Sequence, residues 1–201
     1  VVVGLFAARL RYAETTEKPD ESRAPLTKLR AIMAQENAPG HAQNHILAVG
    51  TMKRGPFRAY THALALWGIK VLITYWFRPG LILNMGTIHY ARWWRLPGTS
   101  KVCFYSNFDG SWESYLEDFI TRARQGQTAA WSNWQGFPRT KFMVSMGAQD
   151  GDAFKQWVRI QQQLVPFWYA RFPELSSDHK RMNAIIHTGV GRARTPSEAA
   201  E

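Results

Sequence analysis

The chain has 201 residues, of which 45% are hydrophobic and 13% aromatic. This fits one globular domain with a sizeable core, or one domain with an appended arm. Cys103 is the only cysteine, which excludes an internal disulfide and a cysteine-based zinc site. The 25 Lys and Arg against 15 Asp and Glu give a formal charge of +10. This excess favours an anionic neighbour, such as a membrane surface, nucleic acid or an acidic protein, although an ordinary solvated basic surface explains it equally well.

Residues 1–42 are interpreted as an N-terminal arm. The apolar start VVVGLFAARLRY has no basic segment before it and does not predict a signal peptide, so we expect a processed chain or the tail of a longer one. The polar stretch TEKPDESRAP is typical of a linker. Residues 26–36 predict one short helix, because their apolar residues recur at helical spacing.

A strand over 44–53 and a long helix over 57–77 follow the arm. Pro56 suits the first turn of that helix. The helix is apolar on nearly every face, yet its apolar part is shorter than the roughly 20 residues needed to cross a bilayer. We interpret it as a buried core helix, with a helix lying against a membrane or a partner as the alternative.

Two alternating segments, 86–96 and 100–108, flank Pro97-Gly98 and predict a β-hairpin. Arg92 interrupts the apolar series of the first arm and falls among aromatic residues. Stacking of its guanidinium on Trp or Tyr is one explanation. An arginine that holds an anion in a pocket is the other.

The hairpin leads into FYSNFDGSWESYLEDF at 104–119. Apolar residues from Trp112 onward recur at helical spacing, with acidic residues on the opposite face. Asp109 or Ser111 can cap this helix, and Gly110 permits the tight turn. A structural role is therefore sufficient to explain the junction.

A fourth strand is predicted over 140–149 and a last helix from 151, which we expect Pro166 to kink or end. The tail at 191–201 is expected to be disordered. The order β-α-β-β-α-β predicts an α+β fold with a ferredoxin-like antiparallel sheet over 43–190, followed by a C-terminal helix. We expect a second sheet, from a homodimer or a second barrel repeat, to cover the other sheet face.

With IHYARW (88–93), FYSNFDGSWESYLEDF and FPRTKF (137–142), the chain resembles the dimeric α+β barrel superfamily. Within it, the chain is similar to uncharacterised bacterial relatives of dye-decolorising peroxidases. The likeness covers one half of a two-repeat barrel. It implies haem held by a proximal histidine, with a distal Asp and an Arg that handle peroxide.

The resemblance also implies site residues. Asp109-Gly110 matches the end of the Gly-x-x-Asp-Gly segment, although Ser106 stands where its first Gly would be. Asp109 would be the acid–base residue, and Arg92 or Arg139 the arginine. The candidates for holding the cofactor are His187, His89, Trp131 and Trp134. The two tryptophans either line a pocket or pin a loop to the barrel.

The resemblance and the composition together lead to two alternative functions. The first is a peroxidase-like oxidoreductase domain that binds a planar or hydrophobic ligand such as haem. The alternative is a non-enzymatic basic accessory subunit, cytoplasmic or peripheral at the membrane, that docks on a membrane or a larger membrane protein complex.

No metal-binding motif is present, and the RNA-binding sheet signature is absent, so nucleic acid is not the expected partner. Whether helix 57–77 faces the core or the outside discriminates between the two functions.

Overall fold

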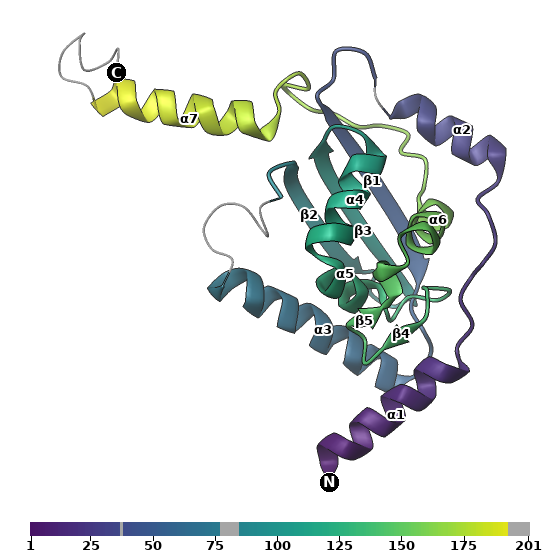
Figure 1. The fold of residues 1–201 in the computed structure, drawn as a ribbon. Helices are drawn as coiled ribbons and strands as arrows, with labels where there is room; N and C mark the ends of the chain where they lie inside the picture. Colours follow the sequence, from purple (N-terminus) through teal and green to yellow (C-terminus); the bar gives the residue numbers. More distant parts are fainter. Residues whose placement is uncertain (37, 77–84, 193–201) are drawn as a thin grey trace.

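The computed structural model describes residues 1–36, 38–76 and 85–192, and shows an α+β fold with one three-stranded antiparallel sheet (Figure 1). The sheet has the order β1-β3-β2. Its strands are β1 (Gln43–Thr51), β2 (Ile88–Arg95) and β3 (Lys101–Asp109).

The predicted hairpin is confirmed as β2 and β3, with Gly98 in the turn at φ 72°. Because both β1 and β2 pair antiparallel with β3, they run parallel to each other on either side of it. Helix α3 (Pro56–Tyr75) therefore connects two parallel strands that a third strand separates.

The predicted fourth strand of this sheet is wrong. Residues 140–149 instead form a separate small hairpin, β4 (Thr140–Lys141) and β5 (Ser145–Met146), followed by the short helix η2 (Gly147–Gln149). The physical reason is that Phe142 and Met143 both have positive φ, which turns the chain back on itself. The segment therefore does not supply the fourth strand that a ferredoxin-like sheet requires.

One face of the sheet is covered by a helical layer (Figure 1). The layer consists of α4 (Trp112–Arg122), α5 (Arg124–Trp131) and α6 (Gly151–Gln161). The helix predicted after Gly110 is confirmed as α4, and Ser111 is its cap, since its hydroxyl accepts a hydrogen bond from Ser114 N at 3.1 Å.

Trp131 lies at the centre of the core. Its ring packs against five other large aromatic rings with centroid distances between 4.7 and 6.4 Å: Trp93, Phe104, Trp134, Phe154 and Trp157. Gly50 of β1 belongs to this packing, because a Cβ there would lie 2.3 Å from Cε3 of Trp134. The bulky rings thus require a strand residue without a side chain.

Helix α3 is not the buried core helix that was expected. Its fully buried residues, Arg58, Thr61, His62 and Ala65, all lie in its first half. Beyond Ala65 none of its side chains is fully buried. The helix packs on α5, outside the layer that covers the sheet, so most of its apolar surface has no sheet to bury against.

The N-terminal arm carries α1 (Val2–Thr16), which the sequence did not predict, and α2 (Leu26–Gln35), which it did. Buried or half-buried carboxylates fasten the arm to the domain. Glu17 pairs with Lys53 at 2.6 Å and with Arg58 at 2.7 Å. Glu36 pairs in a bidentate manner with Arg159, at 2.6 and 3.0 Å.

Helix α7 (Ser177–Arg192) projects from the opposite end of the molecule to α1 (Figure 1). The sequence did not predict it as a helix, and it includes the first two residues of the tail that was expected to be disordered. The remainder of that tail lies outside the described residues.

Glu14 holds the β4–β5 turn. Its carboxylate accepts hydrogen bonds from Thr140 Oγ1 at 2.9 Å, Met143 N at 2.8 Å and Phe142 N at 3.0 Å, and also pairs with Arg11. Burial acts to raise the pKa of Glu14, but these hydrogen bonds outweigh it and lower the pKa below its ordinary 4.5. The charged form is therefore the one that the fold stabilises.

We expect Glu14→Gln to lower the free energy of unfolding by about 1–3 kcal/mol, since two backbone amides and a hydroxyl lose their charged acceptor. Because the folded pKa is lowered, the contribution of Glu14 is present above its unfolded pKa and is lost as pH falls through the folded pKa. Denaturant unfolding at neutral and acidic pH measures both effects. The exposed Glu174→Gln is the matched control, and an equal stability change in the two variants would contradict the assignment.

Candidate functional site

Two of the predicted site residues meet at the end of the sheet. His89 Nε2 lies 2.6 Å from Asp109 Oδ1, and the two side chains are only 11% and 13% exposed. His89 comes from the start of β2, at a bulge between Ile88 and Tyr90, and Asp109 is the last residue of β3. The bulge brings His89 to the Asp109 carboxylate, which regular alternation along β2 does not predict.

The other carboxylate oxygen of Asp109 receives α7. Asp109 Oδ2 accepts hydrogen bonds from Ser177 N at 2.7 Å and from Ser177 Oγ at 2.6 Å. Ser177 is the first residue of α7, so the carboxylate lies at the positive end of the helix dipole. Arg181 adds a contact one turn later by donating to Gly86 O at 3.1 Å. Asp109 therefore caps α7. The sequence had suggested it as a cap of the helix after Gly110, which is α4.

Lys180 completes the cluster. Its Nζ lies 3.2 Å from His89 Nδ1. Because a lysine ammonium only donates, this contact assigns His89 Nδ1 as the acceptor and places the proton on Nε2, where it is donated to Asp109. Both ring nitrogens of His89 are then occupied by protein groups.

This arrangement favours an anchor over a reaction centre. A nucleophilic triad needs the hydroxyl bonded to the histidine, but here Asp109 stands between Ser177 and His89. His89 has no ring nitrogen left for iron or for a substrate proton. The chemistry that these contacts supply is a charge-assisted attachment of α7 to the ends of β2 and β3.

The predicted arginines do not join this cluster. Arg92 pairs with Tyr105 in the β2–β3 register, four residues before Asp109, and its guanidinium lies 6.0 Å from the Tyr105 ring centroid. Stacking, the first of the two explanations offered for Arg92, is thus confirmed. Arg139 immediately precedes β4, at the opposite end of the molecule from α7 (Figure 1).

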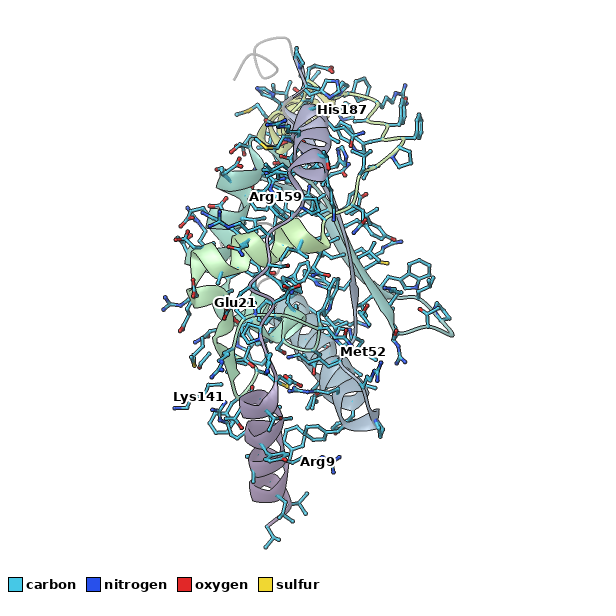
Figure 2. The ribbon with its side chains drawn as sticks, turned by 90° about the vertical axis from the view of Figure 1, so that its right-hand side faces the viewer. Arg9, Glu21, Met52, Lys141, Arg159 and His187 are labelled. Atoms are coloured by element: carbon cyan, nitrogen blue, oxygen red, sulfur yellow. The ribbon has the colours of Figure 1, made fainter. Side chains whose placement is uncertain are left out.

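The predicted cofactor-binding residues do not form a haem pocket with the cluster. Trp131 and Trp134 are 2% and 0% exposed and pack in the core. His187 lies exposed on α7, far from Arg9 and Lys141 at the other end of the molecule (Figure 2). Within residues 1–36, 38–76 and 85–192 no three His, Cys, Asp or Glu side chains group as metal ligands. Haem binding stays a prediction from the resemblance.

Two open hollows lie on the described surface, and no histidine lines either of them. The larger, of about 700 Å³, lies between the arm and α6, and its lining includes Arg139, Arg23, Asp20 and Asp150. The smaller, of about 450 Å³, lies between α1 and the start of α3. Both are open to solvent and have mixed polar and apolar linings, unlike the enclosed apolar cleft that holds a planar cofactor.

A different feature stands out at the end of the molecule where α1, α3 and the β4–β5 hairpin meet (Figure 1). Phe6 and Phe57 pack with ring centroids 5.4 Å apart, and Arg11 donates to Thr140 O at 2.9 Å. Large apolar side chains are exposed all over these elements, and we call them together the apolar end: Val1, Val2, Val3, Leu5, Tyr12, Tyr60, Leu64, Trp67, Leu72, Tyr75, Trp76, Phe142, Val144 and Met146.

Sequence reasoning identified only part of the apolar end. The apolar character of 57–77 was read correctly, but burial was assigned to it. The segment 140–149 was predicted as a strand of the sheet, and the exposure of its Phe142, Val144 and Met146 side chains, at 45%, 44% and 48%, was not predicted. The low charge of α1 was visible, but its fold as a helix was not predicted. None of the described helices is both long and apolar enough to span a bilayer.

The architecture thus defines an α+β domain with a half-covered antiparallel sheet and an apolar end. Comparison of the chain with protein-family models, with curated proteins and with solved structures finds no match in any of the three.

We expect Asp109→Asn to loosen α7. The amide cannot provide the charged acceptor for Ser177 N, so helix capping weakens by about 1–2 kcal/mol. Hydrogen exchange measured by mass spectrometry should show faster exchange in the first turn of α7 and at the start of β2. Asp152→Asn, an exposed residue in the first turn of α6, is the matched control. Unchanged protection of α7 in D109N would rule out the anchor.

Proposed function

We propose that this chain is a non-enzymatic, basic accessory module that docks peripherally on an anionic membrane surface through the apolar end. The observation that carries the proposal is the position of α3. Its outer half exposes Trp67 at 62%, Tyr75 at 75% and Trp76 at 71%, on a helix with hardly a polar face. Such a helix is stable in contact with an apolar neighbour, not with water alone.

The charges of the apolar end favour an anionic surface. Glu14 is the only carboxylate within α1, α3 and 140–146, and it is buried. Arg9, Lys70 and Lys141 from the same elements are exposed. Arg9 and Lys141 both lie at this end of the molecule in Figure 2. Each cation held near an anionic leaflet contributes about 1 kcal/mol.

The residue types favour lipid over a protein partner as the neighbour. Trp and Tyr, with an apolar body and a polar edge, are enriched where hydrocarbon meets water. Trp67, Tyr75 and Trp76 are of this kind, and Lys70 lies between them on the same helix. A protein partner for so basic a surface would have to supply clustered carboxylates, whereas an anionic leaflet presents charged headgroups as a continuous layer.

We expect Trp67→Ala together with Trp76→Ala to reduce binding to vesicles of mixed phosphatidylcholine and phosphatidylserine by at least ~10-fold, since two large rings lose their insertion. Co-sedimentation with the vesicles measures the bound fraction. Trp94→Ala removes a tryptophan that is 47% exposed on the sheet, away from the apolar end, and is the matched control. Equal loss in both variants, or no binding by the wild-type chain, would refute the proposal.

Lys70→Glu tests the electrostatic part. It reverses the only charge in the second half of α3, so we expect weaker binding to anionic vesicles and a smaller dependence of binding on salt. Lys155→Gln on α6, away from the apolar end, is the control. Binding to neutral vesicles as tight as to anionic ones would show that charge plays no part.

A further inference from the structure

No helix of the described residues covers the second face of the sheet. Side chains alternate across a strand, so the residues between the buried ones of β1 and β3 share this face. Ile46, Ala48, Val102 and Phe104 are buried under the helices, but none of the residues on the other side is fully buried. We call that side the open face, made of His45, Leu47, Val49, Thr51, Tyr90, Arg92, Trp94, Lys101, Cys103, Tyr105 and Asn107.

The chemistry of the open face is cationic and aromatic. It holds Arg92 and Lys101, and the carboxylate that ends β3 on the same side, Asp109, is already bonded to His89 and Ser177. Arg92 lies over the Tyr105 ring and has no ion-pair partner among the described residues. Tyr90 and Trp94, on either side of Arg92 along β2, are 49% and 47% exposed. Flat rings thus alternate with an unpaired cation along one strand.

The aromatic surface continues past β2 and β3. Trp168, in the segment between α6 and α7, stacks on His45 with ring centroids 4.8 Å apart and planes at 24°. His45 lies across from Asn107 on β3, and Asn107 lies across from Tyr90 on β2. A row of ring and amide groups therefore crosses all three strands.

We propose that the open face binds single-stranded nucleic acid, with bases stacked on Tyr105, Tyr90 and Trp94 and phosphates held by Arg92 and Lys101. Stacking on aromatic rings in a cationic groove is how single strands are bound without sequence preference. The sequence did not favour this partner because the RNA-binding sheet signature is absent. That signature is not required for stacking, which uses only ring faces and cations that the fold brings together.

Charge separates this partner from a second copy of the chain. Two open faces packed together would place four cations in one interface, because the Asp109 carboxylate at the end of each face is already bonded to His89 and Ser177. A phosphate backbone supplies the missing anions. The open face is also distinct from the apolar end, whose residues come from α1, α3 and the β4–β5 hairpin.

Fluorescence anisotropy with labelled oligouridine and oligodeoxythymidine, each about 12 nucleotides long, tests the proposal at about 50 mM salt. We expect Trp94→Ala and Tyr105→Ala each to weaken binding by at least ~5-fold, because each removes a stacking ring without changing the charge. Tyr105→Leu keeps the apolar bulk at the site and should lose binding as Tyr105→Ala does. The two oligonucleotides distinguish RNA from DNA as the ligand.

The matched control is Trp67→Ala, which removes an exposed tryptophan of the apolar end and should leave the affinity for the oligonucleotides unchanged. Vesicle binding by the same proteins gives the reverse pattern, so the two proposals fail independently. Three results would overturn the inference: no binding, equal affinity for a duplex, or unchanged affinity in the Trp94 and Tyr105 variants. A shift from dimer to monomer in Trp94→Ala on light scattering would assign the face to a second copy instead.

Discussion

Packing of the sheet on one face only is the constraint on which the other features depend. Trp131, Trp134 and Trp157 fill the space between the sheet and the helices so completely that β1 carries a glycine at Gly50. With α4, α5 and α6 in that layer, α3 is left outside it. The other side of the three strands receives no helix from the part of the chain that the structure describes. The two surfaces with apolar and aromatic side chains, the apolar end and the open face, are both products of this arrangement.

The elements that local sequence could specify were predicted well. Helix α4 follows from its apolar period and the Ser111 cap, and the hairpin follows from alternation around Pro97-Gly98. Errors arose where contacts distant in sequence decide the structure. The segment 140–149 alternates like a strand, but Glu14, some 126 residues earlier, holds a turn at Phe142 and Met143. Burial of α3 depends on which helices pack on the sheet, and periodicity does not contain that information.

In the candidate site, too, local sequence predicted some features, and contacts distant in sequence decided the others. Asp109 and His89 were both singled out, and the structure brings them into contact. Their roles could not be inferred, because Ser177 and Lys180, which fix the geometry of both, belong to a helix that sequence did not predict. Arg92 was correctly placed among aromatic rings. Trp131 and Trp134 match a pocket and a core equally well in composition, and only the surrounding rings distinguish the two.

The order in which the chain is synthesised gives the arm a further consequence. Glu14 and Glu36 leave the ribosome long before their partners, since Thr140 and Arg159 follow them by 126 and 123 residues. At about 5–20 residues per second the arm waits for several seconds or longer with its carboxylates unmatched. Closure of such long loops comes late in folding. During that interval α1 lacks the β4–β5 hairpin, which Arg11 and Glu14 bind in the complete fold.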